Sequence, residues 1–86
     1  MPNIEIYSGG YCPYCLKAKT LLKQRGYTFT EYDVQANACK REEMSRRAPG
    51  TRTIPQIFIN DRHVGGCDEL YALDRAGKLA EWAVVA

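Results

Sequence analysis

Hydrophobic and polar residues alternate along residues 3–7, and this two-residue period predicts a short β-strand. Over residues 13–25 the period changes to that of an α-helix, with lysines on the face opposite the apolar residues. Gly26 follows directly and is a typical residue at the end of a helix. The inward face of this predicted helix consists of Cys15, Ala18, Leu21 and Leu22.

Two more elements are expected in the middle of the chain. Residues 27–33 are rich in aromatic and β-branched side chains and predict a second strand. A second helix is expected over residues 37–47, where the apolar period is weak and Met44 and Ala48 are the best candidates for inward-facing residues. Proline and glycine at positions 49–50 end this helix.

The last third of the chain predicts a hairpin followed by a helix. Residues 56–60 form a short apolar strand, and a turn at residues 60–62 leads to a fourth strand around residues 63–64. A third helix is expected to begin near Asp68 and to end before Gly77, and the tail adds one helical turn. The apolar residues expected to face the core from this region are Leu70, Leu73, Leu79 and Trp82.

The order of these elements, β-α-β-α-β-β-α, predicts an α/β fold. A strand-helix-strand opening requires a parallel pair of strands joined by a right-handed crossover. The hairpin near the end of the chain must instead be antiparallel. The sequence therefore predicts a mixed four-stranded sheet with helices on both faces.

Composition narrows the class of protein. The chain has 86 residues, which predicts one domain over residues 1–86. The net charge is +2 and the basic residues are spread along the chain, which argues against nucleic-acid binding. No run approaches ~20 apolar residues, and the first residues lack the pattern of a secretory signal. We therefore expect a monomeric cytoplasmic protein that binds no membrane.

Two cysteines three positions apart, in the segment CPYC, precede the first predicted helix. With Cys12 at the N-cap and Pro13 at the first helical position, the N–H groups of Tyr14 and Cys15 should face the Cys12 sulfur. The positive end of the helix dipole adds to this effect, and both favour the thiolate of Cys12. Cys15 lies one turn further along the same face. The spacing thus predicts that Cys12 attacks a disulfide and that Cys15 resolves the intermediate.

A structural zinc site is the main alternative use of such a cysteine pair. Zinc usually takes four ligands, and only Cys39, Cys67 and His63 remain, at spacings that form no second pair. A permanent structural disulfide would be reduced in the cytoplasm. Redox chemistry is therefore favoured over both alternatives, and no metal ligand is assigned.

Three segments together resemble the dithiol glutaredoxins: CPYC at residues 12–15, TIPQIFI at 53–59 and GGCDEL at 65–70. They occur in the order and spacing of that family, and the resemblance covers nearly the whole chain, most of all to the short bacterial glutaredoxin-3-like type. The resemblance implies a thioredoxin-like fold, which agrees with the order of elements above. It also implies glutathione as a cosubstrate and no permanently bound cofactor.

The resemblance further implies a glutathione-binding groove. Pro55 would be a cis-proline facing Cys12, and the backbone of Ile54 would pair with the cysteine part of glutathione. The start of the third helix would bind the γ-glutamyl carboxylate, with Asp68 pairing with the amino group, whereas Glu69 would only offset the helix dipole. The implied glutathione-binding residues are Tyr14, Thr53, Ile54, Pro55, Gly66, Cys67 and Asp68.

The chain departs from the family pattern before the first cysteine. Many glutaredoxins have Lys or Arg where this chain has Gly9, and usually Thr where it has Tyr11. Arg41 and Arg52 are the alternative candidates for the glycyl carboxylate of glutathione. The remaining cysteines are expected to serve packing, with Cys39 as a buried or half-exposed filler, Cys67 at the ligand end, and His63 as a surface strand residue.

The resulting hypothesis is a glutathione-dependent thiol-disulfide oxidoreductase. Its substrates would be protein disulfides and protein-glutathione mixed disulfides. One alternative is a thioredoxin-type protein reduced by a dedicated reductase. Another is an iron–sulfur scaffold in which two chains hold a cluster through Cys12 and glutathione.

Overall fold

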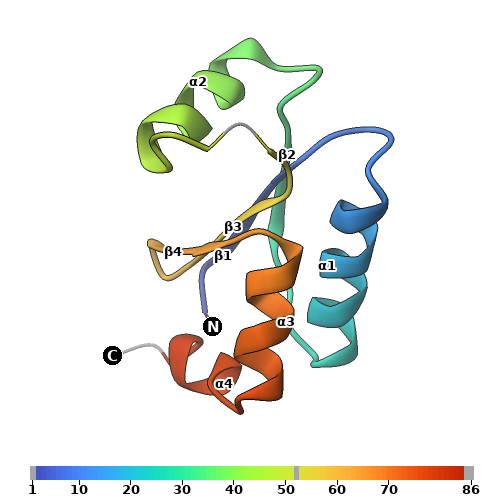
Figure 1. Ribbon diagram of the computed structural model, residues 1–86, viewed down its shortest axis with the longest axis vertical. Helices are drawn as coiled ribbons and strands as arrows, with labels where there is room; N and C mark the ends of the chain where they lie inside the picture. Colours follow the sequence, from blue (N-terminus) through green and yellow to red (C-terminus); the bar gives the residue numbers. More distant parts are fainter. Residues whose placement is uncertain (1, 52, 85–86) are drawn as a thin grey trace.

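The computed structural model describes residues 2–51 and 53–84, which contain four strands and four helices. Figure 1 shows their arrangement. The strands are β1 (Ile4–Ser8), β2 (Thr30–Asp33), β3 (Gln56–Ile59) and β4 (Arg62–Gly65). The helices are α1 (Pro13–Gln24), α2 (Ala38–Arg47), α3 (Cys67–Arg75) and α4 (Leu79–Trp82).

The strands form one sheet in the order β2-β1-β3-β4. β1 is parallel to β2, and α1 makes the crossover between them. β3 is antiparallel to both β1 and β4. The mixed four-stranded sheet predicted from the order of elements is confirmed.

Helices cover both faces of this sheet, as predicted. α1, α3 and α4 pack on one face, where the core contains Ile4, Ile6, Ile57 and Ile59 from the two central strands. α2 packs on the other face, where Tyr7 and Phe58 contribute to a second core. Figure 1 shows α2 separated from α1 and α3 by the sheet. The alternation along β1 therefore divides its side chains between two covered faces.

The boundaries differ from the predictions at β2. This strand begins only at Thr30, whereas the pattern predicted it from residue 27. The loop before it still contributes to the core, because Tyr27 and Phe29 pack against the face covered by α1 and α3. Aromatic residues are thus needed here for packing rather than for strand pairing.

The inward faces of the helices largely match the predictions. Met44 and Ala48 are buried on the α2 side, and Leu70 and Leu79 are buried on the α3 side. Leu73 is only partly buried.

α1 has 12 residues and is the longest helix. Within residues 2–51 and 53–84, no helix has the length and apolar character needed to cross a membrane.

Candidate active site

The site is built on Cys12, the residue that caps α1. Its backbone is extended (φ −138°, ψ 101°) and Pro13 occupies the first turn of the helix. This geometry points the side chain back over the first turn, where the N–H of Cys15 donates to Cys12 Sγ at 3.2 Å. The predicted position of the thiol at the helix start is confirmed, but of the two amides expected to face the sulfur, Tyr14 and Cys15, only that of Cys15 hydrogen-bonds to it.

Cys15 has a different environment, although it lies only three residues further on. It is 1% exposed, and both cysteines are free thiols in this structure. Burial, followed by its hydrogen bond with Cys12, raises the pKa of Cys15 to about 12. At neutral pH Cys15 is therefore a protonated thiol behind the half-buried Cys12.

The loop before β3 lies against the Cys12 sulfur. The Ile54–Pro55 peptide bond is cis, as the resemblance implied. The thiol of Cys12 donates to the carbonyl oxygen of Ile54 across 3.7 Å. A contact between residues 42 positions apart thus brings the second sequence motif to the first.

Gln56 and His63 support this loop through hydrogen bonds, a role that the sequence analysis did not predict. Gln56 is buried, and its Nε2 donates to the carbonyl oxygen of Thr53 at 2.9 Å. Its Oε1 lies 2.7 Å from Nε2 of His63. His63 is exposed, as expected, and stacks on Phe58 with 4.9 Å between ring centroids.

The start of α3 forms the opposite wall of the site. Gly66 is its N-cap, and the Gly66 N–H donates to Glu69 Oε1 at 2.7 Å. A Cβ on Gly66 would lie 3.3 Å from the carbonyl oxygen of Pro55, so the helix start packs closely on the cis-proline loop. Glu69 therefore caps the helix, a more specific role than the expected effect on the dipole.

The residues that the resemblance assigned to glutathione line one common hollow. This hollow has a volume of about 240 Å³ and lies between α1, the cis-proline loop and the start of α3. A second hollow of about 200 Å³ continues along α3 toward Lys17 and Arg75 and shares three lining residues with the first. The first hollow is lined by Tyr14, Thr53, Ile54, Pro55, Gly66, Cys67 and Asp68, together with Glu69.

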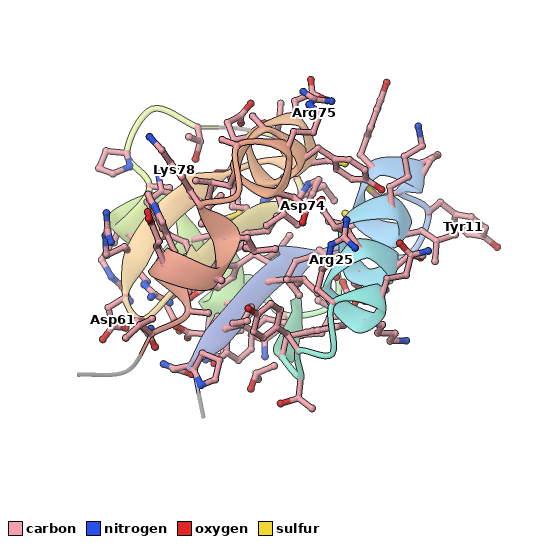
Figure 2. The ribbon with its side chains drawn as sticks, turned by 90° about the horizontal axis from the view of Figure 1, so that it is seen from below. Tyr11, Arg25, Asp61, Asp74, Arg75 and Lys78 are labelled. Atoms are coloured by element: carbon pink, nitrogen blue, oxygen red, sulfur yellow. The ribbon has the colours of Figure 1, made fainter. Side chains whose placement is uncertain are left out.

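Cys12 itself borders a different, larger hollow of about 560 Å³ on the other side of the thiol. The loop at residues 9–11 and the outer face of α1 form its walls. Two of its large side chains are unusually exposed: Leu16 is 64% exposed, and Tyr11 points away from the protein in Figure 2. The reactive sulfur thus lies between the groove and a surface with exposed apolar side chains.

Several candidate residues lie away from this site. Arg41 borders a hollow on the outer surface of α2, whose other lining residues all belong to that helix. Arg52 lies outside the described residues. Cys39 is exposed at the start of α2, and the expectation of a buried or half-exposed filler is therefore wrong. Cys67 is buried, as packing requires, and borders the groove.

The part of the chain that the structure describes contains no cluster of side chains suited to bind a metal ion. There, no three side chains of His, Cys, Asp or Glu are close enough together to hold an ion. The fold instead places two thiols, a backbone carbonyl and a helix start close together. Such an arrangement can exchange thiols with a disulfide and can bind a peptide with a carboxylate group.

Comparisons with known proteins agree with this geometry. A family model described as Glutaredoxin matches residues 4–64. Glutaredoxin 3 of Escherichia coli strain K12 is 54% identical over 79 residues, which cover 92% of this chain and 94% of that protein. The glutaredoxin of Pseudomonas aeruginosa is 49% identical over 79 residues, covering 92% and 93%.

Solved structures are also similar over nearly the whole chain. The solution structure of glutaredoxin from Brucella melitensis has a TM-score of 0.81 at 48% identity and covers 94% of this chain and 87% of that one. The crystal structure of a buckwheat glutaredoxin-glutathione complex has a TM-score of 0.83 at 29% identity, covering 95% and 76%. With its thioredoxin-like fold and its pair of thiols at a helix start, the chain belongs to the glutaredoxin family of thiol-disulfide oxidoreductases.

Proposed function

We propose that this protein uses glutathione to reduce protein disulfides and protein-glutathione mixed disulfides. The observation that carries the proposal is the position of Cys12 Sγ, which contacts the Cys15 amide and the Ile54 carbonyl at the edge of the groove. We further propose that it works as one domain and as a monomer in the reducing environment of the cytoplasm.

The proposed reaction begins when the thiolate of Cys12 attacks one sulfur of the substrate disulfide. A bond forms between Cys12 and that sulfur, and the second sulfur leaves as a thiolate and takes up a proton. Two routes then release the bound partner. Cys15 loses its proton and attacks Cys12 Sγ, which forms the Cys12–Cys15 disulfide and releases the partner sulfur as a thiolate. When the partner on Cys12 is glutathione, a second glutathione thiolate can instead attack the glutathione sulfur, so that glutathione disulfide leaves and Cys12 becomes a thiolate again. Two glutathione molecules reduce the enzyme disulfide and become glutathione disulfide.

The groove supports glutathione as the cosubstrate. The cis-proline loop offers the backbone of Ile54 beside Cys12, where an extended peptide can pair with it. The start of α3 offers backbone N–H groups to a carboxylate, and Asp68 can pair with an amino group. A structurally similar buckwheat protein has been solved as a glutathione complex, which supports the same ligand for this groove.

The experiment is a mixed-disulfide reduction assay coupled to glutathione, performed on the wild type and on two cysteine variants. Cys12→Ser should abolish turnover because the attacking sulfur is lost. Cys15→Ser should keep the removal of glutathione from a glutathionylated peptide but lose the reduction of protein disulfides. Turnover by Cys12→Ser, or efficient reduction of the wild type by thioredoxin reductase but not by glutathione, would contradict the proposal. A purified protein that absorbs visible light would instead favour a cluster scaffold.

A further inference from the structure

Gln35, in the loop between β2 and α2, lies against the glycine pair that precedes Cys12. The N–H of Gly10 donates to Gln35 Oε1 at 3.2 Å. A Cβ on Gly9 would lie 2.7 Å from Cδ and 2.8 Å from Nε2 of Gln35, and also 2.8 Å from Cδ1 of Ile54. The amide of Gln35 therefore occupies the space that a side chain at position 9 would fill.

The two residues next to the Gln35 amide, Gly9 and Ile54, border the two hollows on either side of the Cys12 sulfur. Gly9 borders the open hollow that contains Cys12. Ile54 borders the groove at the start of α3, and its carbonyl oxygen accepts from the Cys12 thiol. Because a Cβ on Gly9 would meet both the Gln35 amide and Ile54 Cδ1, this amide lies close to one lining residue of each hollow.

The loop fixes the orientation of this side chain. The backbone N–H of Gln35 donates to Asp33 Oδ1 at 2.9 Å, which anchors the residue at the end of β2. Its Oε1 is directed toward Gly10, so Nε2 points away from that bond. Within residues 2–51 and 53–84, no residue accepts a hydrogen bond from Nε2. An exposed donor of fixed orientation is thus available beside Cys12.

We propose that Gln35 is a specificity-determining residue whose Nε2 donates to a carboxylate oxygen of the glutathione moiety linked to Cys12. The inference rests on the proposed function. A neutral amide is the proposed donor here, and Lys19, the lysine that lines the Cys12 hollow, is already paired with Glu31 at 2.8 Å. Hydrogen bonds to a charged acceptor are stronger than those between neutral groups, so one such donor can affect binding measurably.

The test compares Gln35→Glu with Gln24→Glu. Gln35→Glu keeps the shape and an acceptor for the Gly10 N–H, but it replaces the donor by a negative charge. The KM for a glutathionylated peptide should rise about tenfold with kcat within about twofold, and the rise should shrink at about 1 M salt, where the Debye length is about 3 Å. Gln24→Glu makes the same change of charge at the far, exposed end of α1. Its KM should stay close to that of the wild type.

An NMR experiment observes the proposed donor, the side-chain NH₂ group of Gln35, directly. In the Cys15→Ser background, linking glutathione to Cys12 should shift the side-chain NH₂ resonance of Gln35 in a ¹⁵N–¹H spectrum, while the NH₂ resonance of Gln24 stays unchanged. An unshifted Gln35 resonance, or equal KM values for the two glutamate variants, would overturn the inference. So would a Gln35→Met variant that is impaired while Gln35→Glu is normal, since that result would assign Gln35 only to the loop. If the wild type itself does not turn over glutathionylated peptide, the proposed function fails instead.

Discussion

The backbone N–H of Cys15 donates to the sulfur of Cys12 at 3.2 Å, so the second cysteine of the pair supports the first through its main chain. Its side chain is meanwhile buried and protonated. The same three-residue spacing therefore supplies both a hydrogen-bond donor for the attacking sulfur and a second thiol within reach. Their different exposure, more than their chemistry, distinguishes the two thiols.

The different exposure of the two thiols predicts selective alkylation. Because burial raises the pKa of Cys15 to about 12, this thiol should stay unmodified by iodoacetamide at pH 7.5, whereas the half-buried Cys12 reacts. Both cysteines lie on one tryptic peptide, so tandem mass spectrometry must locate the label. The exposed Cys39 serves as an internal reference for an accessible thiol. Labelling of Cys15 at the rate of Cys39 would contradict the proposed difference.

Two buried acids predict a loss of stability at high pH. In the folded protein the pKa of Cys15 is raised from 9.0 and that of Tyr7 from 10.0, each to about 12, mainly by burial. Between pH 9 and 12 the unfolded chain therefore binds fewer protons than the folded one. The free energy of unfolding should fall over this range, by up to about 1.4 kcal/mol per pH unit for each group.

Urea unfolding under reducing conditions at pH 7.5, 9 and 10.5 measures this effect. Cys15→Ser removes one of the two acids, so its free energy of unfolding should fall less steeply with pH than that of the wild type. Tyr7→Phe provides the matching comparison for the second acid. Parallel pH profiles for all three proteins would show that these groups do not cause the loss.

Arg47 pairs with a buried carboxylate across the α2 face of the sheet. Its guanidinium contacts both oxygens of Glu5 at 3.0 Å and donates to the Tyr7 hydroxyl at 2.8 Å, and it lies 4.0 Å from the centroid of the Phe58 ring. The Glu5 side chain is only 11% exposed. Arg47→Met should therefore reduce the free energy of unfolding by about 3 kcal/mol, because it leaves a charge buried without its partner.

A matched variant on the surface tests whether burial is the cause. Arg25 pairs with Asp74 at 2.7 Å, and the two side chains meet at the surface in Figure 2. Arg25→Met should cost much less than Arg47→Met because the Arg25 side chain is 52% exposed, against 23% for Arg47, and solvent screens its pair more strongly. Combining Glu5→Gln with Arg47→Met should recover part of the loss. Equal costs for the two single variants, measured by urea unfolding, would refute the argument.

Asp68 and Glu69 are adjacent at the start of α3 but have different expected roles. Asp68→Asn should raise the KM for a glutathionylated peptide by about three- to tenfold, with little change in stability, because Asp68 lines the proposed groove and forms no ion pair within residues 2–51 and 53–84. Glu69→Gln should mainly lower stability, by about 0.5–1 kcal/mol, because Glu69 accepts from the Gly66 N–H. Steady-state kinetics and thermal unfolding of both variants separate these effects. The reverse pattern would exchange the two assignments.

A methyl group at position 9 should disturb the loop before Cys12. Gly9 has no positive φ, so alanine is compatible with its backbone. Its Cβ would nevertheless lie 2.7 Å from Gln35 Cδ and must push that amide aside. In Gly9→Ala, hydrogen exchange of the Gly10 amide should therefore become faster than in the wild type. Unchanged exchange would mean that the Gln35–Gly10 bond survives the substitution.

The sequence alone determined the features that depend on neighbouring residues. Period and breaker residues predicted every helix and strand to within a few positions, with the largest difference at the start of β2. The N-cap position of Cys12 could be predicted from Pro13, the next residue in the sequence. The antiparallel hairpin could be predicted from the short turn between its strands. These features could be predicted because helix caps and turns are decided by interactions within a few residues along the chain.

Only the tertiary structure decided which distant residues meet. The contact of Cys12 with Ile54, the pairing of Glu5 with Arg47 and the position of Gln35 over Gly9 each join separate segments. They depend on strand register and on loop paths, which leave no periodic signal in the sequence. The chemistry of the thiols can therefore be read locally, whereas the groove around them exists only once the sheet has aligned the three motifs.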